Sequence, residues 1–329
     1  MRMFVTGAAG FIGSHLCRAL VHRGHEVAGL DDLSTGRLEN LSAFWGDPGF
    51  RFVRGSVLDR PAVDDLADGA DWVFHMAAAV GTSVTRDQTL DSMRTNLHGT
   101  ENVVAAAHRS RARLLLASTS EIYGKNDKIG LREDDDRVIG SSLMSRWTYG
   151  QAKAIEESLV EAYVRQRGLR ATIARLFSTV GPRQTGRYGT VLPRFVRQAL
   201  RGDPLTVFGS GKQVRCFCHV DDVVPALIRL VAADSACGKA VNFGGSEQVS
   251  IQGLAERVIQ ATGSASTINT ISYEEAYGAG HDDTQRRVPD CTLARNLVGF
   301  RARRGLDEII ESVITDQVSS TPAMACIAS

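Results

Sequence analysis

A glycine-rich turn close to the N-terminus is the feature that most constrains the fold. It follows a short apolar strand, predicted over residues 2–6, and opens a segment with helical periodicity over 14–23. In this context the first glycine permits a tight turn, the second lets the backbone approach a pyrophosphate, and the third lets the helix pack closely on the strand. The N-terminus of the helix offers free N–H groups to phosphates. The sequence therefore predicts a dinucleotide-binding loop containing Gly7, Gly10, Phe11, Ile12 and Gly13.

An acidic residue follows at the spacing that such a loop requires. Asp31 lies 18 residues after Gly13, at the end of a second predicted strand over 25–30. A carboxylate there accepts hydrogen bonds from the adenine ribose hydroxyls and repels a 2′-phosphate, which favours NAD over NADP. A solvated acid at a strand end is the alternative interpretation of Asp31 alone. The same turn adds Asp32, Ser34, Thr35 and Gly36 to the predicted cofactor site.

Strands and helices alternate along the first half of the chain. Further strands are predicted over 50–54, 72–76, 113–117 and 171–176, with helices between several of them. This alternation predicts an α/β fold, a doubly wound parallel Rossmann sheet with a smaller α/β substrate domain. We expect residues 1–177 and 218–244 to form the NAD-binding domain, and residues 178–217 and 245–329 to form the substrate domain, with the active site in the cleft between them.

Composition excludes several classes of protein. The 329 residues carry 38 Lys+Arg against 37 Asp+Glu, a net charge of +1 that argues against a nucleic-acid binder. Apolar runs fall far short of the 18 or so residues of a membrane span, and we see no signal peptide, so we expect a cytoplasmic protein without a membrane partner. The six cysteines form no CxxC pair, and no histidines stand at ligand spacing, so we expect reduced thiols and no metal.

Tyr149 and Lys153 are four residues apart at the start of a predicted helix, which places both side chains on one helix face. A lysine ammonium stabilises a phenolate and lowers the tyrosine pKa from about 10, so Tyr149 is a candidate general base. The pair alone could be an ordinary surface pair, but the glycine loop upstream favours catalysis. Thr119, Ser120 and Glu121 follow a predicted strand, where hydroxyls can reach a substrate oxygen. Capping of the loop is their alternative role.

The glycine loop, Asp31, Thr119, Tyr149 and Lys153 together resemble the extended short-chain dehydrogenase/reductases. Within that family the chain looks most like the NAD-dependent nucleotide-sugar epimerases and decarboxylases, which act on UDP-glucuronic acid or UDP-hexoses. The resemblance covers about residues 3–316 and includes the motifs at 96–100, 118–124, 181–183 and 219–222. It implies bound NAD and a homodimer. It also adds Ser56, Val57, Met76, Ala77, Ala78 and Asn96 to the cofactor site, beside Tyr149 and Lys153.

The resemblance also implies a nucleotide-sugar site in the second half of the chain. The backbone of Thr190, Val191 and Leu192 is expected to meet the uracil or diphosphate. Arg215 is expected to bind the diphosphate, where an arginine fork suits phosphate oxygens. Leu205, Val207 and Phe208 are expected to form the uridine pocket. The run 282–290, with Asp283 and Arg286, is similar to that of UDP-glucuronate decarboxylases and related epimerases. At Ser178 the family often has asparagine, which weakens the transfer of a substrate contact there.

In the mechanism that the resemblance implies, Tyr149 removes the proton of the sugar 4-hydroxyl while NAD accepts the C4 hydride. If the sugar carries a carboxylate at C5, the 4-keto intermediate is a β-keto acid that either loses CO2 or is held and reduced from the other face. Arg187 and Arg194 are candidates to hold that carboxylate by bidentate hydrogen bonding, although Arg187 could be a plain loop arginine. Glu121 favours the opposite outcome, because decarboxylases carry the same Thr-Ser-Glu.

We therefore predict a 4-epimerase that converts UDP-glucuronic acid to UDP-galacturonic acid, with a UDP-glucuronic acid decarboxylase as the alternative. A UDP-glucose 4-epimerase, an NAD(P)-dependent sugar-nucleotide reductase and a non-catalytic NAD-binding protein are further alternatives.

Overall fold

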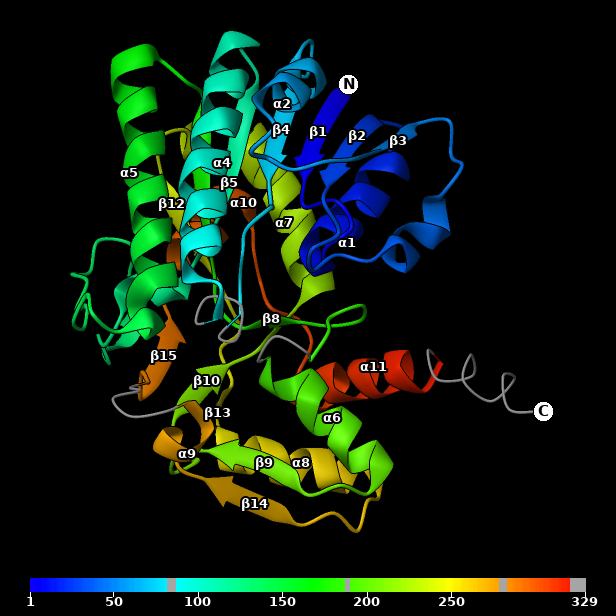
Figure 1. Ribbon diagram of the computed structural model, residues 1–329, viewed down its shortest axis with the longest axis vertical. Coiled ribbons are helices and arrows are strands. Elements are labelled where there is room, and N and C mark those ends of the chain that lie inside the picture. The colour runs from blue at the N-terminus through cyan, green and yellow to red at the C-terminus, as the bar shows by residue number, and fades with distance from the viewer. Residues whose placement is uncertain (82–86, 187–189, 278–282, 320–329) are drawn as a thin grey trace.

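A seven-stranded parallel sheet forms the centre of the upper lobe in Figure 1. The computed structural model describes residues 1–81, 87–186, 190–277 and 283–319. The strand order is β12-β7-β5-β4-β1-β2-β3, and each neighbouring pair is parallel. This order reverses between β1 and β4, which creates the switch point where ligands bind in open α/β sheets. The strands are β1 (Arg2–Thr6), β2 (Glu26–Asp31), β3 (Phe50–Arg54), β4 (Trp72–His75), β5 (Arg113–Thr119), β7 (Ala171–Leu176) and β12 (Ala240–Phe243).

Helices cover both faces of this sheet, because successive strand residues point to opposite sides and both sides are apolar. Met3 and Val5 of β1 pack on one face, beneath α1 (Phe11–Val21), α7 (Val220–Ala232) and α10 (Thr292–Val298). Phe4 packs on the other, beneath α2 (Arg60–Ala67), α4 (Thr89–Arg109) and α5 (Thr148–Arg167). The predicted parallel Rossmann fold is thus observed. The position of α10 differs from our expectation, since residues 292–298 pack on the NAD-binding sheet and not in the substrate domain.

The lower lobe contains shorter elements around a core of its own (Figure 1). Helices α6 (Val191–Arg201), α8 (Ile251–Thr262) and α11 (Leu306–Ser319) surround this core. The parallel pair β9 (Leu205–Phe208) and β14 (Ile268–Ile271) flanks it. A four-stranded sheet with the order β13-β10-β15-β6 joins the lobes. Its strands are β6 (Ile129–Leu131), β10 (Val214–Cys216), β13 (Gln248–Ser250) and β15 (Arg286–Pro289).

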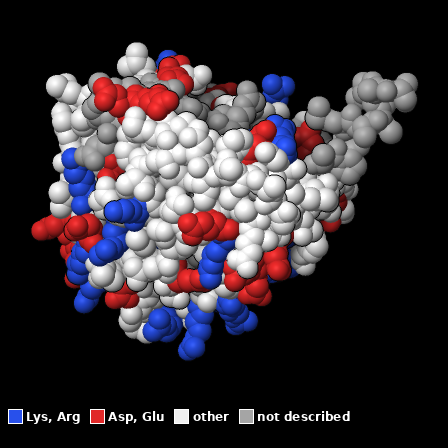
Figure 2. Space-filling model, turned by 90° about the horizontal axis from the view of Figure 1, so that it is seen from below, with Lys and Arg blue, Asp and Glu red and all other residues white. Residues whose placement is uncertain are grey.

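The remaining elements are short connections. Strand β8 (Thr179–Val180) pairs in parallel with β11 (Cys218–His219), and α9 (Tyr273–Tyr277) follows β14. The 3-10 turns are η1 (Leu38–Phe44), η2 (Ser120–Tyr123), η3 (Ser145–Trp147) and η4 (Asp234–Ala236). Basic and acidic side chains are interspersed on the face shown in Figure 2, in keeping with the balanced charge. Within the described residues, no helix has the length and apolar character needed to cross a bilayer.

A partly buried arginine ties the sheet to the helix that follows Trp147. Arg175 of β7 donates from Nη2 to Oε2 of Glu157 at 2.7 Å, and from Nη1 to the Tyr123 hydroxyl at 2.9 Å. Tyr123 in turn donates to Oδ1 of Asn242 on β12 at 2.8 Å. Burial raises the pKa of Tyr123 to about 12, so this hydroxyl keeps its proton. The Ser118 hydroxyl also donates to Glu157. These contacts fix α5 against β5, β7 and β12.

Replacing Glu157 with alanine should therefore be strongly destabilising. The change leaves the Arg175 guanidinium, whose side chain is 11% exposed, without its carboxylate. Loss of one partner of a buried pair costs about 3–5 kcal/mol, which urea denaturation would measure as a loss of unfolding free energy. Glu161→Ala is the matched control, because Glu161 pairs with Arg165 on the exposed side of the same helix. That control should cost less than about 1 kcal/mol. Equal losses for the two variants would contradict the role given to Arg175.

Candidate active site

The glycine loop is packed so tightly that side chains are excluded. Gly7 has φ +68°, and a Cβ on it would lie 2.7 Å from the Ala77 nitrogen. A Cβ on Gly13 would lie 1.9 Å from the Gly7 carbonyl oxygen. Gly10 is the N-cap of α1 and makes no side-chain cap, so the first turn of the helix keeps its N–H groups for a ligand. The loop therefore has the shape and the donors that a pyrophosphate needs.

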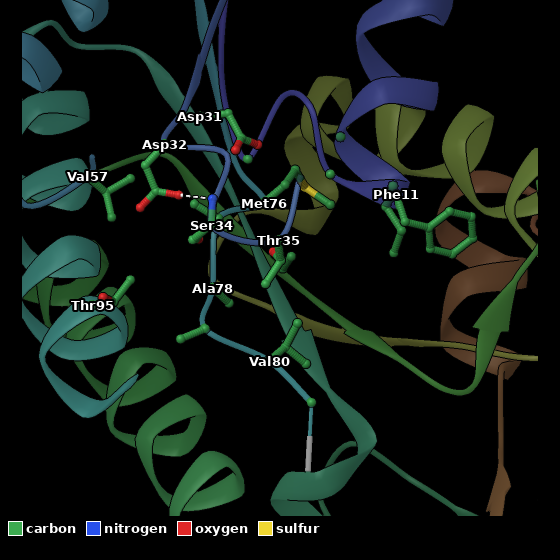
Figure 3. A pocket seen from close by; sticks show the side chains of 18 of the residues that line it. Phe11, Asp31, Asp32, Ser34, Thr35, Val57, Met76, Ala78, Val80 and Thr95 are labelled. Atoms are coloured by element: carbon green, nitrogen blue, oxygen red, sulfur yellow. Dashed lines mark hydrogen bonds between the residues drawn. The ribbon is translucent and has the colours of Figure 1, made fainter. Parts of the chain in front are cut away.

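Asp31 lies at the carboxyl end of β2, beside other side chains of the cavity (Figure 3). Backbone N–H groups fix its carboxylate by hydrogen bonds. Oδ2 accepts the Ala9 N–H at 3.0 Å and Oδ1 accepts the Leu33 N–H at 2.8 Å. Burial raises the pKa of Asp31 above its ordinary value. Asp32 stabilises the same turn by accepting the Ser34 N–H at 2.9 Å. A carboxylate held in this way is positioned to accept ribose hydroxyls.

A cavity of about 670 Å³ opens at the carboxyl ends of the central strands. Figure 3 shows side chains from the glycine loop, the β2 turn and the segment after β4 around it. Most of the predicted cofactor residues line it: Gly7, Gly10, Phe11, Ile12, Gly13, Asp31, Asp32, Ser34, Thr35, Val57, Met76, Ala77, Ala78, Tyr149 and Lys153.

Three predicted cofactor residues do not line the cavity but lie next to segments that do. Asn96 accepts the Ala79 N–H at 2.8 Å and donates to the Ala79 carbonyl at 3.2 Å, which fixes the segment after β4. Ser56 accepts the Leu58 N–H at 3.2 Å. Gly36 lies so close to Asp31 that a Cβ would be 2.8 Å from Oδ1.

Tyr149 and Lys153 both line the cavity from the first turns of α5. Nζ of Lys153 donates to the Ala117 carbonyl at 3.0 Å and to Oε2 of Glu156 at 2.8 Å. The sequence predicts a lowered pKa for Tyr149, but in the structure this pKa is raised above its ordinary value. Burial is the main cause, and the negative charges of Glu156 and Glu121 add to it. Glu156, which pairs with Lys153, was not part of the sequence argument. Its negative charge accounts for part of the difference between the predicted and the observed direction of the pKa shift.

The predicted residues after β5 divide into two groups. Thr119 lines the cavity, and its hydroxyl accepts the Glu121 N–H at 3.2 Å, so it both caps η2 and faces the ligand space. Ser120 is buried beneath this turn. Glu121 lies beside the cavity, with its carbonyl close to Gly150 of α5. The chain thus places Glu121 next to Tyr149 without placing it in the cofactor cavity.

A cluster of charges surrounds Glu121. Its carboxylate binds Arg146 of η3 at 2.7 Å and Arg287 of β15 at 3.3 Å. Asp283 binds Arg146 and Arg215, each at 3.0 Å. Burial opposes ionisation of Glu121, but Arg146 and Arg287 outweigh it and lower its pKa to about 2. The same balance, dominated by Arg215 and Arg146, keeps the pKa of Asp283 far below its ordinary range.

Comparison with known proteins agrees with this geometry. Residues 3–244 match the NAD dependent epimerase/dehydratase family. The UDP-N-acetyl-alpha-D-glucosaminuronate decarboxylase of Bacillus cytotoxicus is 38% identical over 94% of this chain and 97% of its own. The UDP-glucuronic acid decarboxylase 1 of Xenopus tropicalis is 34% identical over 95% of this chain and 71% of its own. The UDP-glucuronic acid 4-epimerase of Bacillus cereus, solved with UDP-glucuronic acid and NAD, is 26% identical with a TM-score of 0.87, and the match covers 97% of this chain and 100% of that one.

The chain belongs to the NAD dependent epimerase/dehydratase family. NAD is its cofactor, and the glycine loop fits that molecule because Gly7 and Gly13 make a cradle that any Cβ would fill. When bound, NAD supplies hydride acceptance and return. Gly7, Gly10, Gly13 and Asp31 would hold it.

The predicted substrate residues of this epimerase/dehydratase family member are spread over different environments. Thr190 is the N-cap of α6 and lines the cavity. Arg194 lies 4.2 Å over the Phe208 ring and donates to the Thr206 carbonyl at 3.0 Å. Ser178 has φ +31°, and its carbonyl accepts the Cys218 N–H at 3.2 Å. Arg187 lies outside the described residues.

Three apolar residues of the predicted nucleotide site have side chains that face the core of the lower lobe. Leu192, Leu205 and Val207 are fully buried in the core of the lower lobe, and Val191 packs against that core. The alternation of β9 explains this, since it turns Leu205 and Val207 inward and leaves Phe208 partly exposed. Any contribution of these side chains to binding is made through packing.

Sequence reasoning missed two arginines of the charge cluster. We predicted Arg286, but it is the next residue of β15, Arg287, that reaches Glu121 and Thr284. Neighbouring strand residues face opposite ways, so only one of the two can join the cluster. Arg146 was also missed, although its position three residues before Tyr149 at the start of α5 was a usable signal.

The tight fit of the loop predicts the effect of one methyl group. Gly13→Ala should weaken NAD binding about tenfold or more, because the added Cβ would clash with the Gly7 carbonyl and overpacking costs about 1–3 kcal/mol. Isothermal titration with NAD measures this. Gly305→Ala is the control, since its nearest neighbour would be 3.8 Å away and far from the loop. NAD affinity unchanged in Gly13→Ala would exclude this loop as the pyrophosphate site.

Proposed function

We propose that this protein is an NAD-dependent decarboxylase of a UDP-linked hexuronic acid, either UDP-glucuronic acid or its 2-acetamido counterpart. The observation that carries the proposal is the ionised Glu121, held beside Tyr149 by Arg146 and Arg287. The names of the sequence relatives, which are decarboxylases of these two substrates, support it. Our sequence-based preference for epimerisation depended on Arg187, for which the described residues offer no geometry.

The first step of the reaction concerns the sugar 4-hydroxyl. Tyr149 takes its proton while Thr119 holds the same oxygen, and NAD, when bound, would supply the acceptor for the C4 hydride. With a carboxylate on C5, the resulting 4-keto sugar is a β-keto acid. Cleavage of the bond between C5 and the carboxyl carbon releases CO2, and the electron pair moves onto O4 as an enolate. Lys153, which lines the cavity below Tyr149, stabilises that negative charge.

Glu121 favours this step through its charge. Before cleavage the sugar carboxylate and Glu121 are two negative charges close together, which is unfavourable. In the proposed complex, loss of CO2 moves the substrate charge onto O4, where the ammonium of Lys153 offers a counter-charge. The difference between the two states lowers the barrier, because only interactions that change along the reaction accelerate it.

The 4-epimerase remains a second candidate because of the structural match to the UDP-glucuronic acid 4-epimerase of Bacillus cereus. An epimerase must keep the sugar carboxylate in the plane of the C4 carbonyl, and a free arginine fork would do this. Arg146 and Arg287 are instead engaged by Glu121, and Arg146 also by Asp283. This engagement supports our proposal of a decarboxylase over an epimerase.

One incubation separates the two reactions. The protein is mixed with UDP-glucuronic acid, or with the 2-acetamido analogue, in D2O with NAD, and the product is analysed by mass spectrometry and proton NMR. A decarboxylase releases CO2 and takes up solvent deuterium at C5, where the carboxylate was. A product that keeps its carboxylate, gains no deuterium and shows a small H3–H4 coupling identifies an epimerase and overturns the proposal.

Two variants test the assigned residues. Tyr149→Phe should lower kcat by about 100-fold or more, as expected for the loss of a general base.

Glu121→Gln should slow CO2 release by a factor of about 10 or more, by removing roughly 1.4 kcal/mol or more of charge repulsion, while NAD affinity stays unchanged. Glu101→Gln, at an exposed site on α4, is the control and should leave both quantities as they are. CO2 release at the normal rate in Glu121→Gln would remove Glu121 from the mechanism.

A further inference from the structure

A second glutamate, Glu156, holds the ammonium of Lys153 from the side opposite the cavity. It lies one helical turn after Lys153 on α5 and is 1% exposed. Its Oε2 accepts a hydrogen bond from Nζ at 2.8 Å, and the Ala117 carbonyl accepts another at 3.0 Å. An ammonium has three hydrogens, so two are fixed by the protein and one is left for the cavity. The direction of Lys153 is therefore set by Glu156 and β5.

Among the residues that the structure describes, the far side of Glu156 is lined by neutral polar groups. Thr6 Oγ1 lies 2.7 Å from Nδ1 of His75, and Nε2 of His75 lies 2.9 Å from the Thr100 hydroxyl. Thr100 is next to the Glu156 carboxyl group and helps to stabilise its ionised form. Burial lowers the pKa of His75 to about 3, so this imidazole is neutral at physiological pH. Strands β1 and β4 and helix α4 thus contribute dipoles to Glu156, not an opposing charge.

The remaining charges around Glu156 can be assigned one by one. Glu157, the next residue, is bound by Arg175 of β7 and by Ser118 of β5. Glu121 of η2 acts on Tyr149 from the other side. Lys153 is the cation that contacts Glu156 among the described residues. Burial raises the pKa of Glu156 even though Lys153 opposes this, so its carboxylate depends on the lysine for its stability.

The three side chains Tyr149, Lys153 and Glu156 therefore behave as one electrostatic unit. A lysine ammonium on the same helix face as a tyrosine favours its phenolate. The charge of Glu156 opposes the phenolate of Tyr149. This opposition is useful in the proposed reaction, in which Tyr149 first accepts a proton and later donates one. A tyrosine that removes a proton from the 4-hydroxyl and later returns one to O4 must not be too acidic, because catalytic groups work best when their pKa lies near the operating pH.

We propose that Glu156 is a positioning residue that orients Lys153 and governs how readily Tyr149 gives up its proton. The inference rests on the proposed function in one respect, that Tyr149 is the base of the reaction. It assigns no contact between Glu156 and the substrate. Its prediction concerns the pH at which the base becomes active, and not the identity of the sugar.

Glu156→Gln is the test, because the amide keeps the shape and the hydrogen-bond acceptor but removes the charge. The tyrosinate absorbance of the NAD-bound protein is titrated, and Tyr149 is isolated by subtracting the same titration of Tyr149→Phe in each background. We expect the apparent pKa of Tyr149 to fall by about one unit or more. The acid limb of the kcat–pH profile should move to lower pH by the same amount, because activity is lost as pH falls through this pKa. KM should change little.

Two further variants separate charge from structure. Glu156→Asp keeps the charge, so its acid limb should lie nearer to wild type than that of Glu156→Gln. Glu161→Gln removes an exposed charge from the same helix and should move neither the titration nor the profile. A Tyr149 titration unmoved in Glu156→Gln, or moved equally by Asp and Gln, would overturn the proposal. A shifted titration in a protein that releases no CO2 from UDP-uronic acids would support the role of Glu156 and refute the decarboxylase.

Discussion

The site depends on two consecutive glutamates of α5, each of which neutralises a buried cation. Glu156 binds Lys153 on the cofactor side, and Glu157 binds Arg175 on the sheet side. Adjacent helix residues are separated by about 100° around the axis, so the two pairs hold the helix in two directions. With α5 fixed in this way, Tyr149 and Lys153 meet the carboxyl ends of β4 and β5 in one register. Buried pairs of this kind contribute more to specificity of arrangement than to stability.

The parts of the structure that follow from local patterns were predictable. The glycine loop, the strand before it and Asp31 lie within one stretch of about thirty residues, and each has a steric or hydrogen-bonding reason that is visible in the sequence. Six of the seven central strands were predicted to within about two residues of their ends, whereas β12 was not predicted as a strand. Tyr149 and Lys153 share a helix face whatever surrounds them, so their proximity needed no tertiary information.

The parts that depend on distant segments were not predictable in the same way. The cluster around Glu121 gathers residues of η2, η3, β10 and β15, and no periodicity connects them. The choice between Arg286 and Arg287 requires knowing which face of β15 meets η2. Likewise, the sequence of α10 does not indicate on which lobe the helix packs. Its place on the Rossmann sheet follows from packing against α7 and β12. The predicted sign of the Tyr149 pKa shift was wrong for the same reason, since the sequence argument counted Lys153 but neither the burial of Tyr149 nor the charge of Glu156.

The charge count in the cluster also bears on the reaction. Arg146, Arg215 and Arg287 face Glu121 and Asp283, so the group as a whole carries one net positive charge. In the decarboxylase that we propose, a diphosphate bound by Arg215 would compete with Asp283 for that arginine. Asp283 would then depend more on Arg146, the guanidinium that it shares with Glu121. On this proposal, nucleotide binding and the orientation of Glu121 are connected through Arg146.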